Sequence, residues 1–116
     1  MNNAVVFDEL TFFAQVKKRT VMYLAGKSLL SLRDHLYGMG YAFSACDRPD
    51  ALKMFHLFIE YYNSKLLQTD QNGYVCWWNH LMYISGGSDA DAFDAFFREF
   101  EAYLLNAHHL QLPEVQ

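Results

Sequence analysis

The side chains of this sequence that could carry out chemistry are chiefly two cysteines and five histidines in 116 residues. Cys76 and His80 are four residues apart, so a helix would place both on one face, where a metal ion could bridge them. A tetrahedral zinc site needs two further ligands, and the remaining candidates, His108 and His109, lie near the end of the chain. We therefore interpret Cys76 as a thiol packed in the core, and predict no metal and no cofactor.

Nucleophilic or acid–base chemistry has little support either. Cys46 with His35 or His56 would supply a thiol and a base, but these residues belong to no motif that fixes their geometry. The sequence contains no glycine-rich phosphate loop, no nucleophile elbow and no Glu-x-x-His pair. We therefore predict that the protein is not an enzyme, and leave an enzyme that uses Cys46 or Cys76 as an open alternative.

Length and composition predict one globular domain over residues 1–116. Hydrophobic residues make up 53% of the chain and aromatic residues 17%, more rings than a small core is expected to hold. The first residues lack the basic and apolar segments of a signal peptide, and no stretch approaches the roughly 18 apolar residues of a membrane span. We therefore expect a cytoplasmic protein with reduced thiols.

Apolar residues at helical spacing predict an all-α bundle of about five helices. Helices are expected at residues 7–18, 28–45, 50–67, 74–84 and 88–106, with Asp8, Ser28, Asp50 and Ser88 as N-caps. Residues 20–27 are expected to be an apolar connector, and the tail at 107–116 is expected to fray. An Asn-Gly turn at 72–73 leaves a β-hairpin as the competing assignment there.

Two glycines interrupt the helix expected at residues 28–45. Gly38 and Gly40 each cost about 1 kcal/mol of helix stability relative to alanine. We therefore expect this helix to lie in close contact with a second helix at the glycines, with a kink as the alternative.

Charge is unevenly divided along the chain. Residues 1–58 hold seven Lys/Arg against five Asp/Glu, whereas residues 59–116 hold two against eight, and the net charge is −4. In the helix expected at 88–106, Asp91, Asp94, Arg98 and Glu101 form a stripe opposite the phenylalanines. Phosphates would be repelled by the acidic half, so we expect a basic protein partner, or no partner at all, rather than a nucleic acid. The stripe is then either a docking surface for that partner or the solvated face of an ordinary amphipathic helix.

Short motifs run through the chain in a recognisable order: Arg19, Met22-Tyr23-Leu24, Ser28-Leu29, Leu32, Leu36, Gly38, Tyr41-Ala42, Phe58, Tyr62, Trp77, Phe93, Phe96-Phe97 and Tyr103. In this order they resemble a group of small bacterial immunity proteins that are encoded beside polymorphic and contact-dependent growth inhibition toxins. The sequence departs from that group at Thr20, where the group has Pro, and at Ala25, where it has Gly.

The resemblance implies a cytoplasmic protein that binds a cognate toxin domain and occludes its active site. Such toxins are often basic nucleases, and a tRNA-directed ribonuclease is favoured here. The implied protein binds neither nucleic acid nor membrane directly, and a monomer is favoured over a homodimer. The predicted toxin-binding residues are Asp70, Trp77, Trp78, Asp89, Asp91, Asp94 and Glu101. A core position for both tryptophans stays open, as does a helical scaffold or regulatory subunit, possibly a homodimer, as the alternative function.

Overall fold

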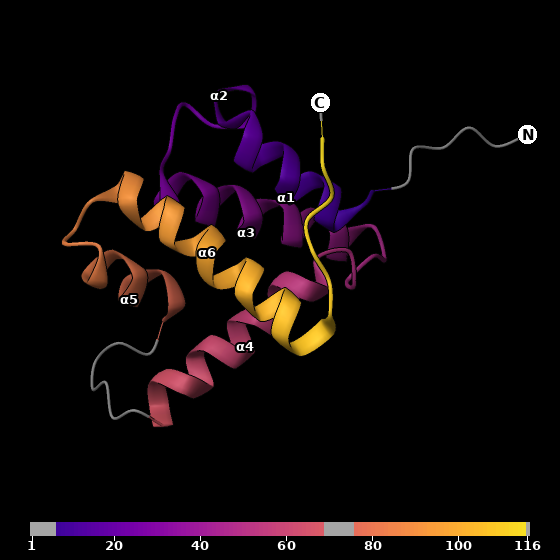
Figure 1. Cartoon of the computed structure of the whole chain (residues 1–116). Helices are drawn as coiled ribbons and strands as arrows, with labels where there is room; N and C mark the ends of the chain where they lie inside the picture. Colours follow the sequence, from indigo (N-terminus) through magenta and orange to yellow (C-terminus); the bar gives the residue numbers. More distant parts are fainter. Residues whose placement is uncertain (1–6, 69–75, 116) are drawn as a thin grey trace, which may run out of the picture.

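The computed structural model describes residues 7–68 and 76–115, and over these ranges it is helical, with no strand. Its helices are α1 (Glu9–Lys18), α2 (Thr20–Tyr23), α3 (Leu29–Ala45), α4 (Lys53–Gln68), α5 (Trp77–Ile84) and α6 (Asp89–His108) (Figure 1). The all-α prediction is confirmed. The single turn α2 was not expected, and the proposed hairpin turn at 72–73 lies outside the described residues.

Local caps decide where three of the helices begin. The side chains of Asp8, Ser28 and Ser88 accept hydrogen bonds from backbone N–H groups three residues further on, as the sequence predicts. The start of α4 differs from the prediction, because residues 49–52 form turns and the helix begins at Lys53. Its first-turn N–H groups are capped by Glu9 of α1 instead of by Asp50.

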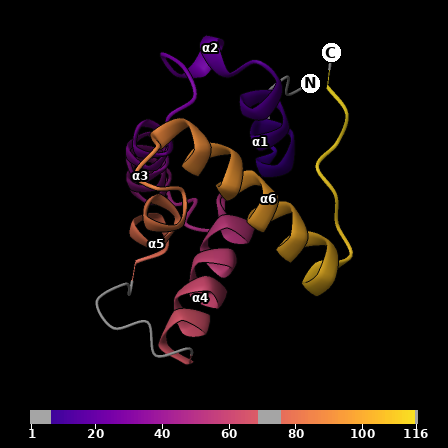
Figure 2. The ribbon, with the colours of Figure 1, turned by 60° about the vertical axis from the view of Figure 1, so that its left-hand side comes forward.

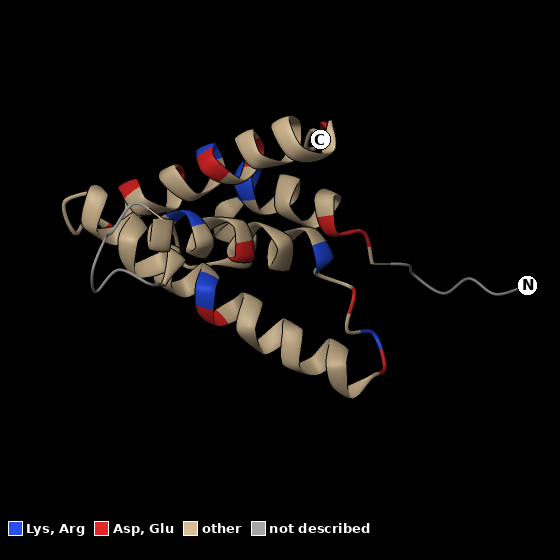
Figure 3. Ribbon diagram, turned by 90° about the horizontal axis from the view of Figure 1, so that it is seen from below, with Lys and Arg blue, Asp and Glu red and all other residues tan. Residues whose placement is uncertain are grey.

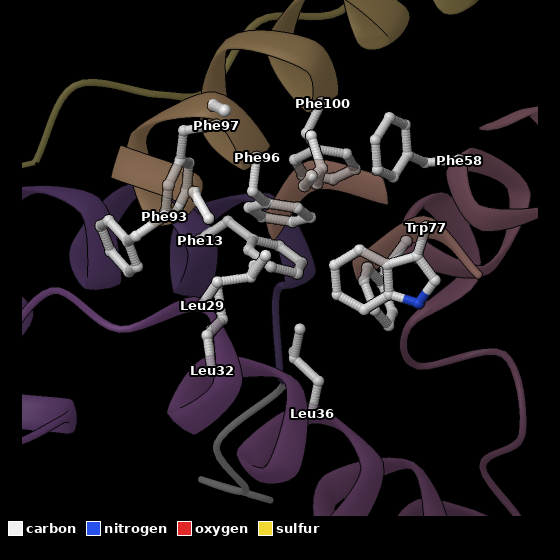
Figure 4. Packing of buried hydrophobic residues seen from close by; sticks show 14 of the residues in the cluster. Phe13, Leu29, Leu32, Leu36, Phe58, Trp77, Phe93, Phe96, Phe97 and Phe100 are labelled. Atoms are coloured by element: carbon white, nitrogen blue, oxygen red, sulfur yellow. The ribbon is translucent and has the colours of Figure 1, made fainter. Parts of the chain in front are cut away.

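The longest helix, α6, packs against α3, α4 and α5 and carries the centre of the core. Figure 2 shows it running across the other long helices. The predicted apolar stripe is buried: Phe93, Phe96, Phe97, Phe100 and Leu104 are each at most 3% exposed. The ring of Phe96 meets rings from α4, α5 and α6, with centroids 5.7 Å from Phe58, 5.6 Å from Trp77 and 5.4 Å from Phe100 (Figure 4).

The expected close contact at the glycines of α3 is wrong. A Cβ atom placed on Gly38 or Gly40 would meet no other atom of residues 7–68 and 76–115 within 4 Å, apart from chain neighbours and the helix backbone itself. Gly38 lies on the exposed side of the helix, opposite the buried Leu29, Leu32 and Leu36. Gly86 and Gly87 follow the end of α5. Their φ angles are 65° and 82°, a conformation that glycine adopts without strain.

The C-terminal segment follows α6 back along the molecule. The helix continues to His108, two residues past its expected end, and His109 closes it in the left-handed conformation. Beyond it, Leu112 packs against the core and the Lys18 ammonium donates to the backbone carbonyl of Val115. The fraying expected for this segment stays a prediction. No helix within the described ranges is long and apolar enough to cross a membrane.

Candidate protein-interaction surfaces

The acidic stripe of α6 is largely neutralised within the molecule. Asp94 pairs with Lys27 at 3.1 Å, and Glu101 pairs with Lys17 at 2.7 Å. Both lysines come from the basic first half of the chain, so packing brings the two unequal halves together. Each pair is partly exposed and is therefore expected to contribute less than about 1 kcal/mol to stability. The stripe nevertheless presents much less free negative charge than its sequence suggests.

Asp89 has a structural role at the start of another helix. Its carboxylate accepts hydrogen bonds from the Ser28 hydroxyl and, at 3.1 Å, from the backbone N–H of Leu30. Ser28 is also the N-cap of α3, so Asp89 reinforces that cap from α6. Asp91 is exposed, and within the described part of the chain its carboxylate forms no ion pair or hydrogen bond.

The two tryptophans predicted as anchors occupy different environments. Trp77 is 2% exposed and lies in the core, where its Nε1–H donates to the Tyr37 hydroxyl at 3.2 Å. Trp78 is half-buried, and the Arg33 guanidinium lies 4.4 Å from the centre of its ring. Asp70 lies outside the described residues. The predicted site residues therefore do not form one patch: Asp89 and Trp77 support the fold, whereas Trp78 and Asp91 are accessible.

Two neighbouring helices, α3 and α5, carry few charged residues. α3 has 17 residues and α5 has 8, and among them only Arg33 and Asp34 are Asp, Glu, Lys or Arg. These two side chains pair with each other at 2.9 Å. Figure 3 shows this directly: α3 carries one blue and one red segment near its beginning and is tan from there to its end. The two helices are in contact, and they lie along the same side of the molecule in Figure 2.

The exposed side of α3 carries two tyrosines, and the helix surface between them is flat. Tyr41 is 81% exposed and Tyr37 is 50% exposed, with Gly38 between them. We define the charge-poor face as Arg33, Asp34, Tyr37, Gly38, Tyr41 and Trp78. Tyrosine, tryptophan and arginine, with few other charges, are the composition found at the centres of protein–protein interfaces. Sequence reasoning missed this face, although residues 35–46 contain no Asp, Glu, Lys or Arg.

The pair considered as metal ligands, Cys76 and His80, spans the first turn of α5. Cys76 is exposed at the N-cap of α5, so its predicted core position is wrong. His80 Nδ1 lies 2.7 Å from the Tyr62 hydroxyl. Burial raises the pKa of Tyr62 to about 12 and lowers the pKa of His80. Within the described ranges, no three His, Cys, Asp or Glu side chains are grouped so that they could hold a metal ion.

Comparison with known proteins gives no further guide to these surfaces. No protein-family model, curated protein or solved structure matches the chain. The features that bear on function are therefore the accessible charge-poor face and the sequence motifs that carry the resemblance.

Proposed function

We propose that the protein is an immunity protein that binds a cognate toxin domain and neutralises it by occluding its active site. The toxin would be a basic nuclease of the contact-dependent growth inhibition type, with a tRNA-directed ribonuclease favoured. The observation that carries this proposal is the charge-poor face, where Tyr41 is 81% exposed and Tyr37 is 50% exposed. Large aromatic side chains at an accessible surface are the usual anchors of tight protein complexes.

Charge supports a basic partner in a general way. The net charge of −4 would attract a cationic domain over a distance and speed encounter at low salt. A stable complex would bury on the order of 1,200–2,000 Å² in total. The charge-poor face would supply the aromatic centre of that contact.

Co-expression with a toxin provides the test. The toxin domain encoded by the adjacent reading frame is expressed in a bacterial host with and without this protein, and growth is followed. We expect growth to be restored only by this protein, and the two proteins to copurify as a complex. An immunity protein for an unrelated toxin serves as the control. Continued growth arrest, together with no binding of the purified proteins at micromolar concentration, would disprove the proposal.

A second candidate function is supported by the same face. A helical scaffold or regulatory subunit could use the exposed Tyr37 and Tyr41 to pair with a second copy of the chain. Sedimentation of the isolated protein separates the two candidates. A stable dimer at low micromolar concentration favours the subunit, whereas a monomer that binds the toxin favours the immunity protein.

A further inference from the structure

We propose that the groove between α1 and α6 is a binding site for an extended peptide, and that the C-terminal segment of the chain occupies it as a detachable strap. We define the strap as residues 111–115. The ligand that the site takes is a peptide with two apolar side chains three residues apart and a carboxylate between them. The site lies on other helices than the charge-poor face, and it does not depend on the immunity function.

The strap itself shows which side chains such a peptide places in the groove. Leu112 and Val115 are its partly buried residues, and Leu112 packs against the core. The other three residues of the strap are exposed. A spacing of three residues places side chains on one side of an extended chain that makes about three residues per turn. Figure 1 shows the chain turning back after α6 and running toward α1. The two apolar residues therefore define the side-chain positions of the ligand.

The groove also carries a charge that suits the strap. It is lined, besides the strap, by Ala14, Lys17 and Lys18 of α1 and by Glu101 of α6. The Lys17 ammonium is paired with the Glu101 carboxylate, whereas the Lys18 ammonium donates to the uncharged backbone carbonyl of Val115. Glu114 borders the same hollow. The positive charge of Lys18 therefore favours a carboxylate at the position that Glu114 occupies in the strap.

The strap is held loosely in its groove. Leu112 lines two hollows, one of about 760 Å³ toward α1 and one of about 330 Å³ against α6. Over residues 7–68 and 76–115, no backbone–backbone hydrogen bond involves residues 111–115. Segments with few buried contacts and few backbone hydrogen bonds open at a small fraction of the free energy of global unfolding. We therefore expect the strap to leave the groove by local opening.

The end of α6 is closed before the strap begins. The backbone N–H of His109 donates to the carbonyl of Leu105 at 3.1 Å, and that of Leu110 donates to the carbonyl of Leu104 at 3.0 Å. These bonds satisfy carbonyl groups that a helix end leaves without a partner, and they include no residue of the strap. The pair of Lys17 and Glu101 joins α1 to α6 at 2.7 Å, again without the strap. Opening therefore leaves both walls of the groove in place, ready for a peptide from outside.

Leu112→Asp in the full chain is the sharpest test, because it expels the strap and leaves the groove unchanged. The probe is a synthetic peptide of residues 111–115 with blocked ends, and binding is followed by NMR through the backbone signals of Ala14 and Lys18. Leu112→Asp should bind this peptide at least about tenfold more tightly than wild type, whose groove is filled by its own strap at high effective concentration.

Matched controls separate the groove from nonspecific binding. Gln111→Asp in the full chain adds the same side chain at an exposed residue of the strap, and its affinity for the peptide should stay within about threefold of that of wild type. A peptide that itself carries Leu112→Asp should bind about tenfold more weakly than the wild-type peptide, because it loses an apolar anchor. Adding Lys18→Met to the Leu112→Asp protein should weaken binding by about fivefold, since one hydrogen bond is lost.

The possible outcomes have different meanings. Val115→Asp, at the other anchor, is the second releasing variant, and both variants should keep the wild-type circular dichroism spectrum. If both unfold, the strap is an integral part of the core and is not detachable. A folded releasing variant that binds the peptide no better than wild type, or that binds the Leu112→Asp peptide equally well, would overturn the site. A wild-type dimer that the peptide dissociates would show exchange of the strap between two copies and would support it. Because no toxin is used, failure here leaves the immunity function standing.

Discussion

Glu9 of α1 caps the first turn of α4 through Phe55, whose backbone N–H lies 2.7 Å from Glu9 Oε2. The other carboxylate oxygen accepts from the backbone N–H of Met54 at 2.9 Å. One side chain thereby satisfies two N–H groups that a helix start leaves without a partner, and it places negative charge at the positive end of the helix dipole. The same contact fixes α1 against α4.

The contact makes opposing contributions to the pKa of Glu9. Burial raises the pKa above the ordinary value of 4.5 and outweighs the hydrogen bonds from Phe55 and Met54, which lower it. The Glu9 carboxyl therefore keeps its proton to a higher pH in the folded state than in the unfolded state. The stability that this group contributes is fully present below pH 4.5 and declines as the pH rises through the folded pKa.

A glutamine at this position should remove that pH dependence. We compare the free energy of unfolding of the wild type with that of Glu9→Gln. The difference, wild type minus variant, is expected to decrease as the pH rises from about 4 to about 6. Urea denaturation at several pH values measures the difference. Glu60→Gln, an exposed glutamate on α4, serves as the control. A difference that increases with pH would mean that the two hydrogen bonds outweigh the burial of the carboxylate.

Much of the fold can be predicted from the sequence because its determinants are local. Asp8, Ser28 and Ser88 cap helices through N–H groups three residues away, and the phenylalanine stripe of α6 follows from helical spacing. The cap by Glu9 and the cap by Asp89 join distant segments, and nothing near either residue in the sequence indicates its partner. The same reason explains why the ion pairs of the acidic stripe cannot be read from the sequence: the pairing with Lys17 and Lys27 depends on how α6 packs.

The role of Asp89 can be separated from the general effect of acidic residues at a helix start. Asp89 and Asp91 both lie in the first turn of α6, so both gain from the helix dipole. Only Asp89 also caps α3. We expect Asp89→Ala to lower the free energy of unfolding by about 1–2 kcal/mol. Asp91→Ala should change it by about 0.5 kcal/mol or less. Equal effects in chemical denaturation would show that the contact with α3 contributes nothing.

His80 should make stability depend on pH in the opposite direction from Glu9. Burial is the largest cause of its lowered pKa, with Lys65 acting in the same sense and Glu99 against it. Since the unfolded histidine takes up its proton near pH 6.5, stability is lost as the pH falls through that value toward the folded pKa. We expect the free energy of unfolding to rise between about pH 5 and pH 7.5, and His80→Gln to flatten that rise. His56→Gln, at an exposed position of α4, serves as the control.

The open position of Gly38 can itself be tested through stability. Alanine is the better helix former by about 1 kcal/mol, and the added methyl group meets no atom of the described residues within 4 Å. Gly38→Ala should therefore stabilise the protein by up to about that amount. Gly87→Ala has the same open space but a φ of 82°, and it should destabilise by about 1 kcal/mol or more. Urea denaturation of the isolated protein compares the two variants at equal concentration. If Gly38→Ala proves destabilising, α3 must be covered at this point in the isolated protein, and a second copy of the chain becomes the occupant to examine.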